Sequence, residues 1–227
     1  MSVVVRDVAS RGRRTVTFRA GQFLVGMACW GLASTLLIRS ELGLGPWDAF
    51  HVGLHRLSGL SVGVAAIVTG LVIVAVTLLM RIRPGIAILA NTVLIGVFVD
   101  LLLPVVPAAP NLVLSVGYFA AGLGLAGLAT GLYIGAGFGQ GPRDALMIGL
   151  HERTGWSVRR TRTLLEASVL AAGWAMGGQV GLGTVLFALG IGPVVQWGLR
   201  TFPQPPPEPR DDVDPAAPGG EPLRRAA

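Results

Sequence analysis

Residues 43–48 read GLGPWD and residues 139–144 read GQGPRD, so one Gly-x-Gly-Pro-x-Asp pattern occurs twice, 96 positions apart. Sliding the chain against itself by 96 residues, without a gap, matches about 25 of the 80 positions from 21 to 100. The 20 residues that begin at each motif share 11 identities. Self-similarity at a fixed offset indicates an internal duplication, and the two copies are most alike around the motif.

The composition is typical of a protein that lies in lipid. The chain is 52% hydrophobic and only 13% charged, whereas a soluble domain carries roughly 25% charged residues. We therefore predict an all-α polytopic membrane protein with six transmembrane helices, and the lipid bilayer is its first predicted partner. The apolar stretches, each near the roughly 20 residues that a spanning helix needs, lie at about 20–38, 60–80, 85–103, 112–135, 163–179 and 182–199.

The basic residues, all eighteen of them arginine, predict the orientation in the membrane. They gather before the first span, between the second and third, between the fourth and fifth, and after the sixth. The turns at 104–111 and 177–181 carry none, and only Arg39 and Arg56 fall on the opposite side. Because positive charge near span ends stays cytoplasmic, we predict a multi-pass protein of the bacterial cytoplasmic membrane with cytoplasmic N- and C-termini. Arginines placed beside spans, without one basic face, argue against a nucleic-acid partner.

The duplication predicts how the chain is divided. Residues 1–19 form a basic cytoplasmic arm, 20–103 a first three-helix repeat, 112–199 a second, and 201–227 a disordered, Pro-rich cytoplasmic tail. Because each repeat has an odd number of spans, the second enters the membrane from the opposite side. The prediction is a 3+3 inverted-topology repeat, the layout of many secondary transporters, whose sites lie near the midplane where the halves meet.

The doubled motif is expected to start a short helix in each half. Proline suits the first helical position, and an aspartate in the first turn complements the helix dipole. These half-helices, 46–57 and 142–153, are too short to span. They are either re-entrant, with free N–H groups directed at an anionic group, or interfacial, and the sequence leaves both open. The candidate substrate-binding residues are Gly43, Gly45, Pro46, Asp48, Gly139, Gly141, Pro142, Arg143 and Asp144.

Three polar residues within apolar runs are candidates for ion coupling, because ionisable groups at membrane depth are usually functional. They are Glu166, Asp100 and Asn91. Arg162 precedes Glu166 by four residues, which predicts an ion pair along one helix. Asp100 has an alternative interpretation at the outer interface, close to Pro104.

The remaining arginines and the histidines have simpler interpretations. Arg159 and Arg160 are expected to set orientation only, and orientation also accounts for the arginine at 143 without a ligand contact. His55 and His151 follow the two motif aspartates by seven residues, about 10 Å along a helix, too far for a shared metal. With His51, they are assigned to the membrane interface, and neither a metal nor a cofactor is predicted.

Gly127, Gly131 and Gly135 are spaced by four, which predicts a close helix contact. With Gly31 and Thr35 in the first repeat, the spacing favours a crossing of the first and fourth spans. A contact between two chains would use the same pattern, so a homo-oligomer stays open.

The segments GLGPWD, GQGPRDALMIGL and RTGWSVRRTRTLLE, together with six-span hydropathy, resemble the YczE/YyaS/YitT family of bacterial integral membrane proteins, and its YczE branch in particular. The resemblance covers roughly residues 20–200 and implies a multi-pass protein of the cytoplasmic membrane. It brings no catalytic residues.

The leading functional hypothesis is a permease for a small polar or anionic solute, with its site at the interface of the two repeats. A membrane accessory or scaffold protein and a passive channel are the alternatives. An enzyme is not predicted, because we find no nucleophile and base with a third group that orients them.

Overall fold

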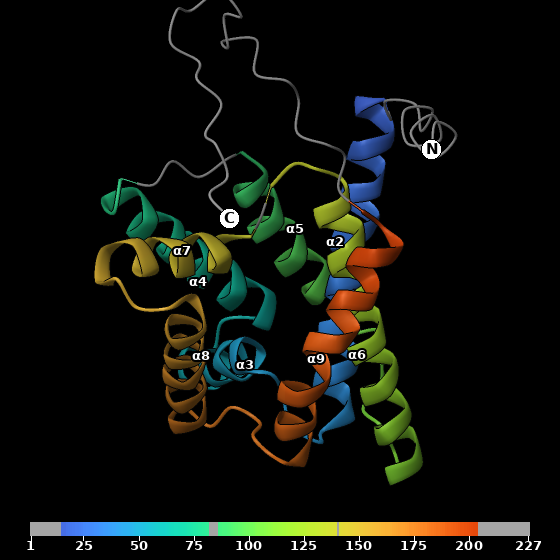
Figure 1. Ribbon diagram of the computed structural model, residues 1–227. Helices are drawn as coiled ribbons and strands as arrows, with labels where there is room; N and C mark the ends of the chain where they lie inside the picture. The colour runs from blue at the N-terminus through green and yellow to red at the C-terminus, as the bar shows by residue number, and fades with distance from the viewer. Residues whose placement is uncertain (1–14, 82–85, 140, 204–227) are drawn as a thin grey trace, which may run out of the picture.

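The structure, a computed structural model, describes residues 15–81, 86–139 and 141–203. These residues form eight helices and no strand (Figure 1), so the all-α prediction is confirmed. Most of the predicted arm and of the predicted tail lies outside the described residues. The helices are α2 (Val16–Ser40), α3 (Pro46–Ser58), α4 (Val62–Leu79), α5 (Ile86–Leu102), α6 (Leu112–Gly135), α7 (Pro142–Thr154), α8 (Val158–Ala175) and α9 (Leu182–Thr201).

Four of the described helices, α2, α4, α6 and α9, are long and apolar enough to cross a membrane. Helix α5 is apolar but shorter. Helix α8 has the length, but Arg159, Arg160, Arg162 and Glu166 make its first half strongly charged. It also begins five residues before the predicted span at 163, because the Ser157 hydroxyl caps it by accepting a hydrogen bond from the Arg160 amide.

The two halves build their helices from the same local signals at an offset of 96 residues. Helices α2, α3, α4 and α5 begin at 16, 46, 62 and 86, and α6, α7, α8 and α9 begin at 112, 142, 158 and 182. Both short helices start with a proline after a glycine N-cap and end at a glycine with positive φ, 75° at Gly59 and 69° at Gly155. Because only glycine adopts this conformation without strain, the motif and the following glycine together determine where α3 and α7 begin and end.

The equivalent helices α2 and α6 pack together and run antiparallel (Figure 1). Near the start of α2, Arg19 Nε donates to the Ala136 carbonyl at 2.8 Å, just beyond the end of α6. One turn later, Gln22 Nε2 donates to the Leu132 carbonyl at 2.8 Å. The predicted crossing of the first and fourth spans is therefore present within one chain.

The glycine ridge of α6 contacts a different helix from the one predicted. Gly127 and Gly131 lie against the backbone of α9 at Val194 and Gly198. The equivalent Gly31 of α2 lies against Phe98 of α5. The ridge therefore joins the first and last helices of each half, and the α2–α6 crossing uses other small residues.

A methyl group added at Gly131 is expected to destabilise the protein, since a Cβ there would collide with the Gly198 carbonyl, while one at Gly124 would meet nothing within 4 Å. We expect Gly131→Ala to cost about 1–3 kcal/mol through overpacking of two backbones. Gly124→Ala, on the same helix, is the control and should be neutral or gain up to about 1 kcal/mol of helix propensity. Thermal unfolding in detergent measures both, and equal melting temperatures would contradict the predicted packing.

Candidate functional site

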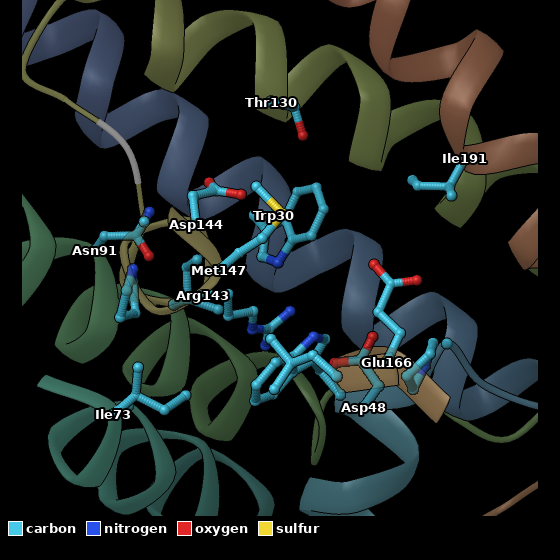
Figure 2. Close-up of a pocket in the computed structure, with 18 of the residues that line it drawn as sticks. Trp30, Asp48, Ile73, Asn91, Thr130, Arg143, Asp144, Met147, Glu166 and Ile191 are labelled. Atoms are coloured by element: carbon cyan, nitrogen blue, oxygen red, sulfur yellow. The ribbon is translucent and has the colours of Figure 1, made fainter. Parts of the chain in front are cut away.

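The N-terminal ends of α3 and α7 meet at one central cavity of about 580 Å³, which is lined by residues of both halves. The two short helices lie across the direction of the long helices α2, α6 and α9 (Figure 1). Figure 2 shows Asp48 of α3 and Arg143 and Asp144 of α7 among the labelled lining residues. The duplicated motif thus brings its polar residues together from positions 96 residues apart.

Seven of the nine predicted substrate-binding residues line this cavity, and they are Gly45, Pro46, Asp48, Gly141, Pro142, Arg143 and Asp144. The first glycine of each motif does not line it. Gly43 and Gly139 have φ values of 119° and 116°, a conformation that other residues rarely adopt. These two glycines therefore shape the chain that leads into each half-helix.

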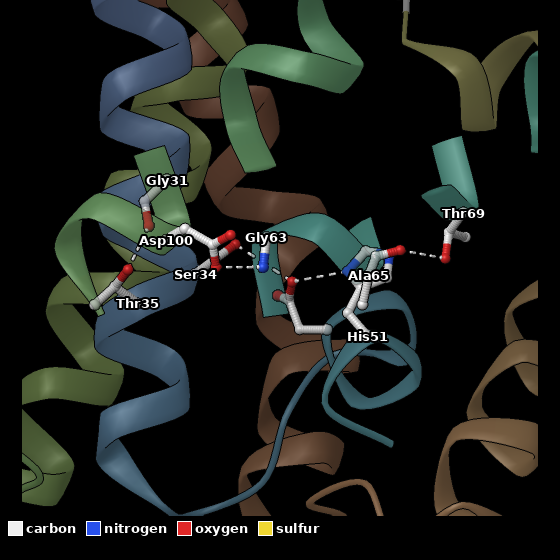
Figure 3. A network of polar contacts seen from close by, with 9 residues as sticks. Gly31, Ser34, Thr35, His51, Gly63, Ala65, Thr69 and Asp100 are labelled. Atoms are coloured by element: carbon white, nitrogen blue, oxygen red, sulfur yellow. Dashed lines mark hydrogen bonds and ion pairs between the residues drawn. The ribbon is translucent and has the colours of Figure 1, made fainter. Parts of the chain in front are cut away.

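The three ion-coupling candidates separate in the structure. Glu166 and Asn91 line the cavity, and Asp100 is not among its lining residues. The Asp100 carboxylate instead accepts hydrogen bonds from the Ser61 hydroxyl and, at 2.7 Å, from the Gly63 amide (Figure 3). Asp100 of α5 therefore caps the start of α4 and holds these two helices together.

Asp48 is the most enclosed carboxylate of the cavity, with 15% of its side chain exposed. The Ser34 hydroxyl donates to its Oδ1 at 3.3 Å, and His51 Nδ1 lies 4.0 Å from the same oxygen. The interface assignment of His51 is wrong, because its side chain is only 5% exposed and lines the cavity. It faces Asp48 from one helical turn further along α3, a spacing that could have identified it.

Arg143 carries the cavity's central positive charge. Its guanidinium carbon lies 4.7 Å from the centre of the Trp47 ring, within the range of a cation–π contact. Trp47 and Arg143 occupy the same position of the two motifs, one aromatic and the other positively charged. These two equivalent residues pack on each other in the cavity. The placement of Arg143 in the cavity shows that orientation alone does not explain this arginine.

Glu166 is paired within its own helix. Arg162 Nε donates to Glu166 Oε1 at 2.9 Å, which confirms the ion pair that their spacing predicts. Both side chains line the cavity and remain partly exposed.

His55 and His151 lie at the far ends of the two short helices, as predicted. Their Nδ1 atoms approach the carbonyls of Leu60 and Trp156 in equivalent turns. Within residues 15–81, 86–139 and 141–203, no group of three or more His, Cys, Asp or Glu residues could hold a metal ion.

The aromatic part of the cavity was not identified from the sequence. Trp30, Trp47, Tyr133 and Phe187 line it, and each comes from a different helix. Phe187 is the equivalent of Asn91, and these two residues lie beside Gly45 and Gly141, the second glycines of the two motifs. The last helix of each half therefore contacts the motif of the other half, a relation that only the three-dimensional arrangement shows.

The two ends of the cavity differ although their sequences are almost the same. Leu37, Ile38, Val62 and Val99, here called the closed cluster, are buried in one hydrophobic core. Their equivalents 96 residues later, here called the open cluster, line the cavity and are Tyr133, Ile134, Val158 and Val195. Val62 is 6% exposed and Val158 is 45% exposed, so identical residues have opposite environments.

The helices beside the two clusters differ in the same way. Helices α4 and α5 pack together, with Gly63 and Gly96 in backbone contact. The equivalent helices α8 and α9 make no comparable contact, and a Cβ at Gly192, the equivalent of Gly96, would meet nothing within 4 Å. The cavity is therefore closed between α4 and α5 and opens between α8 and α9.

An all-helical chain with several membrane-crossing helices around a polar cavity defines a polytopic helical membrane protein. The chain belongs to a family of unknown function (DUF6198), whose sequence profile matches residues 17–200. It is 40% identical over 179 residues to the uncharacterized membrane protein YczE of Bacillus subtilis, which covers 78% of this chain and 83% of that protein.

Two further relatives agree with this assignment. The uncharacterized protein YyaS of Bacillus subtilis is 30% identical over 166 residues, 71% of this chain and 83% of the relative. An uncharacterized protein of Haemophilus influenzae is 32% identical over 183 residues, 81% of this chain and 84% of the relative. The predicted resemblance to the YczE and YyaS proteins is confirmed, and no solved structure matches the chain.

Proposed function

We propose that the protein is a small permease of the bacterial cytoplasmic membrane that works by alternating access and binds its solute in the central cavity. The observation that carries this proposal is the contrast between the closed cluster and the open cluster. An alternating-access transporter needs a site that is open at one end and shut at the other, with halves able to exchange these roles. Nearly identical residues in opposite environments meet this requirement.

The membrane arrangement in this proposal is a 3+3 inverted repeat with six crossing segments, to which α5 and α8 contribute. The common offset of 96 residues and the antiparallel packing of α2 on α6 support it. Helices α3 and α7 are re-entrant in this arrangement, because the first residues of both line the central cavity. Lipid solvates the outer faces of the bundle, where many large apolar side chains are exposed.

The direction of opening follows from the arginines. The open cluster contains Val158, which directly precedes Arg159 and Arg160, and arginine-rich segments remain cytoplasmic. The cavity therefore opens to the cytoplasm, both termini are cytoplasmic, and the closed cluster shuts the external end. Arg39 and Arg56, the two arginines predicted on the external side, donate hydrogen bonds to the carbonyls of Leu103 and Gly177.

The cavity favours a permease over the two alternatives. A passive channel needs a continuous path, whereas the closed cluster includes Leu37 at 1% and Val99 at 3% exposure. A scaffold acts through its surface and has no need for three carboxylates and two guanidinium groups around an internal cavity. Charges at membrane depth are costly and are usually retained for transport or proton relay.

Proteoliposomes with the purified protein are expected to accumulate a radiolabelled solute that a thermal-shift screen of metabolites identifies. We expect Asp48→Asn, Asp144→Asn and Glu166→Gln each to lower the initial rate at least about tenfold, the loss of roughly one charge-assisted hydrogen bond. Glu152→Gln, on α7 but outside the cavity lining, is the control and should keep the rate. Full activity in all three cavity variants would reject the site. Single-channel currents would indicate a passive channel. A partner that co-purifies in stoichiometric amount, without solute flux, would indicate a scaffold protein.

A further inference from the structure

The Arg143 guanidinium is free to bind an anionic group. It stacks on the Trp47 ring, and among the described residues no carboxylate forms an ion pair with it. The carboxylates of Asp48, Asp144 and Glu166 act on it electrostatically without contacting it. A guanidinium presents five N–H donors in a planar fork that matches a carboxylate. These donors face the cavity (Figure 2).

The helix N-termini are not needed for anion binding. Pro46 and Pro142 occupy the first helical positions and have no N–H donor. Asp48 and Asp144 place their own carboxylates in the first turns of α3 and α7, where they complement the helix dipoles. An anionic group of a solute would meet these carboxylates at the helix ends. Because Arg162 is paired with Glu166, Arg143 is the remaining position for it.

The charges of the cavity also call for a positive group. The ionisable side chains that line it, apart from His51 and Tyr133, are Asp48, Asp144, Glu166, Arg143 and Arg162. With all five in their charged forms, the formal charge of the cavity is one negative. A solute that is only an anion would raise this excess to two beside Asp48, whose side chain is only 15% exposed. A solute that is only a cation would leave the Arg143 fork unused. A group of each sign satisfies both conditions.

Much of the remaining wall of the cavity is apolar, with Thr69, Asn91, Thr92 and Thr130 as its uncharged polar side chains. Trp30, Phe187 and Ile191 contribute apolar side chains to it from α2 and α9. The volume of about 580 Å³ falls within the range of small-molecule sites, roughly 300–1,000 Å³. The cavity therefore has room for an apolar substituent beside the two charged groups.

We propose that the cavity binds a small zwitterion with an apolar side group, whose carboxylate pairs with Arg143 and whose ammonium group lies among Asp48, Asp144 and Glu166. This inference rests on the proposed function for the role of the cavity and narrows its solute class. The carboxylate takes a bidentate position on the guanidinium, with Trp47 holding the guanidinium plane. The ammonium group supplies positive charge beside the three carboxylates.

Thermal shift of the purified full-length protein in detergent tests the solute class, because a ligand that binds the folded form raises the apparent melting temperature. The zwitterions are L-phenylalanine and L-leucine. The matched single-charge analogues are phenylpropionate and isocaproate, which lack the amine, and phenylethylamine and isoamylamine, which lack the carboxylate. We expect each zwitterion to raise the melting temperature more than either of its analogues at equal concentration.

Variants of Arg143 test the assigned residue by titration of the same ligands. Arg143→Gln should weaken zwitterion binding by about ten- to a hundredfold, since it removes a charge-assisted bidentate contact. Arg143→Lys, which keeps the charge but loses the fork, should fall between wild type and Arg143→Gln. Arg160→Gln is the matched control, because Arg160 lies 4.7 Å over the Trp156 ring, outside the cavity, and should bind as wild type.

Two outcomes would overturn the inference. The first is stabilisation by a single-charge analogue that equals or exceeds that of its zwitterion, and the second is no stabilisation by either zwitterion. The comparison of ligands on the wild-type protein can detect either outcome, so the inference can be rejected even if an Arg143 variant fails to fold. If a zwitterion binds but proteoliposomes do not accumulate it, the permease proposal fails and the solute class stands. If proteoliposomes accumulate only a single-charge analogue, the solute class fails and the permease proposal stands.

Discussion

A cysteine in place of Val158 is expected to react at least about tenfold faster with a polar maleimide than a cysteine in place of Val62, because thiol reactivity requires exposure. The two positions are equivalent, 96 residues apart, and hold the same residue in the native chain. Val158 is 45% exposed and lines the cavity, whereas Val62 is 6% exposed in the closed cluster. The measurement is the labelling rate in membranes, in a Cys29→Ser background that removes the native thiol.

The sidedness of labelling tests the orientation at the same time. The Val158 cysteine should react in inside-out vesicles, where the cytoplasmic face is accessible. Val105→Cys is the control for the external side, because Val105 is 74% exposed in the turn between α5 and α6. Equal rates at positions 62 and 158 would mean that neither end is shut. Labelling at positions 105 and 158 from one common side would overturn the inverted arrangement.

The boundaries of the two short helices could be predicted from the sequence because local residues determine them, whereas α8 begins five residues before its predicted start. A proline at the first position, a serine cap and a glycine with positive φ start or end helices without help from distant parts of the chain. These signals are repeated at positions 46 and 142, at 61 and 157, and at 59 and 155, and the helices follow them. The duplication also nominates nine motif residues as substrate-binding, and seven of them line the cavity, although the sequence leaves open whether the half-helices are re-entrant or interfacial.

The roles of Arg143 and Asp100 depend on contacts that no local pattern contains. Counting arginines assigns position 143 to the cytoplasmic side, but the direction of α7 brings its first turn to the cavity and onto Trp47. The neighbours of Asp100 along the sequence are mostly apolar. Its hydrogen-bond partners, however, are Ser61 and Gly63, almost 40 residues earlier. The difference between the closed and open clusters could not be predicted at all. Val62 and Val158 are the same residue, so only the conformation distinguishes them.

Removing the Asp100 carboxylate is expected to loosen the closed end of the cavity. In the native protein, the Gly63 amide donates to Asp100 at 2.7 Å and the Ser61 hydroxyl donates to the same carboxylate. Asp100→Ala removes this acceptor from both donors. We expect a loss of about 2–3 kcal/mol in the free energy of unfolding, the usual cost of charge-assisted hydrogen bonds to a partly buried group. Gln196→Ala is the control, because residue 196 is the exposed equivalent of Asp100 on α9, where α8 does not pack.

The loss should affect the closed end more than the rest of the protein, because Asp100 joins α4 to α5 directly beside Val62. In a Cys29→Ser background, Asp100→Ala should raise the labelling rate of a cysteine at position 62 by about ten- to a hundredfold, as 1.4 kcal/mol corresponds to a factor of ten. Labelling at position 158 should stay unchanged. A variant that melts at a lower temperature but is labelled equally slowly at position 62 would show that Asp100 stabilises the bundle without controlling the closed end. The closed cluster alone would then shut the external end of the cavity.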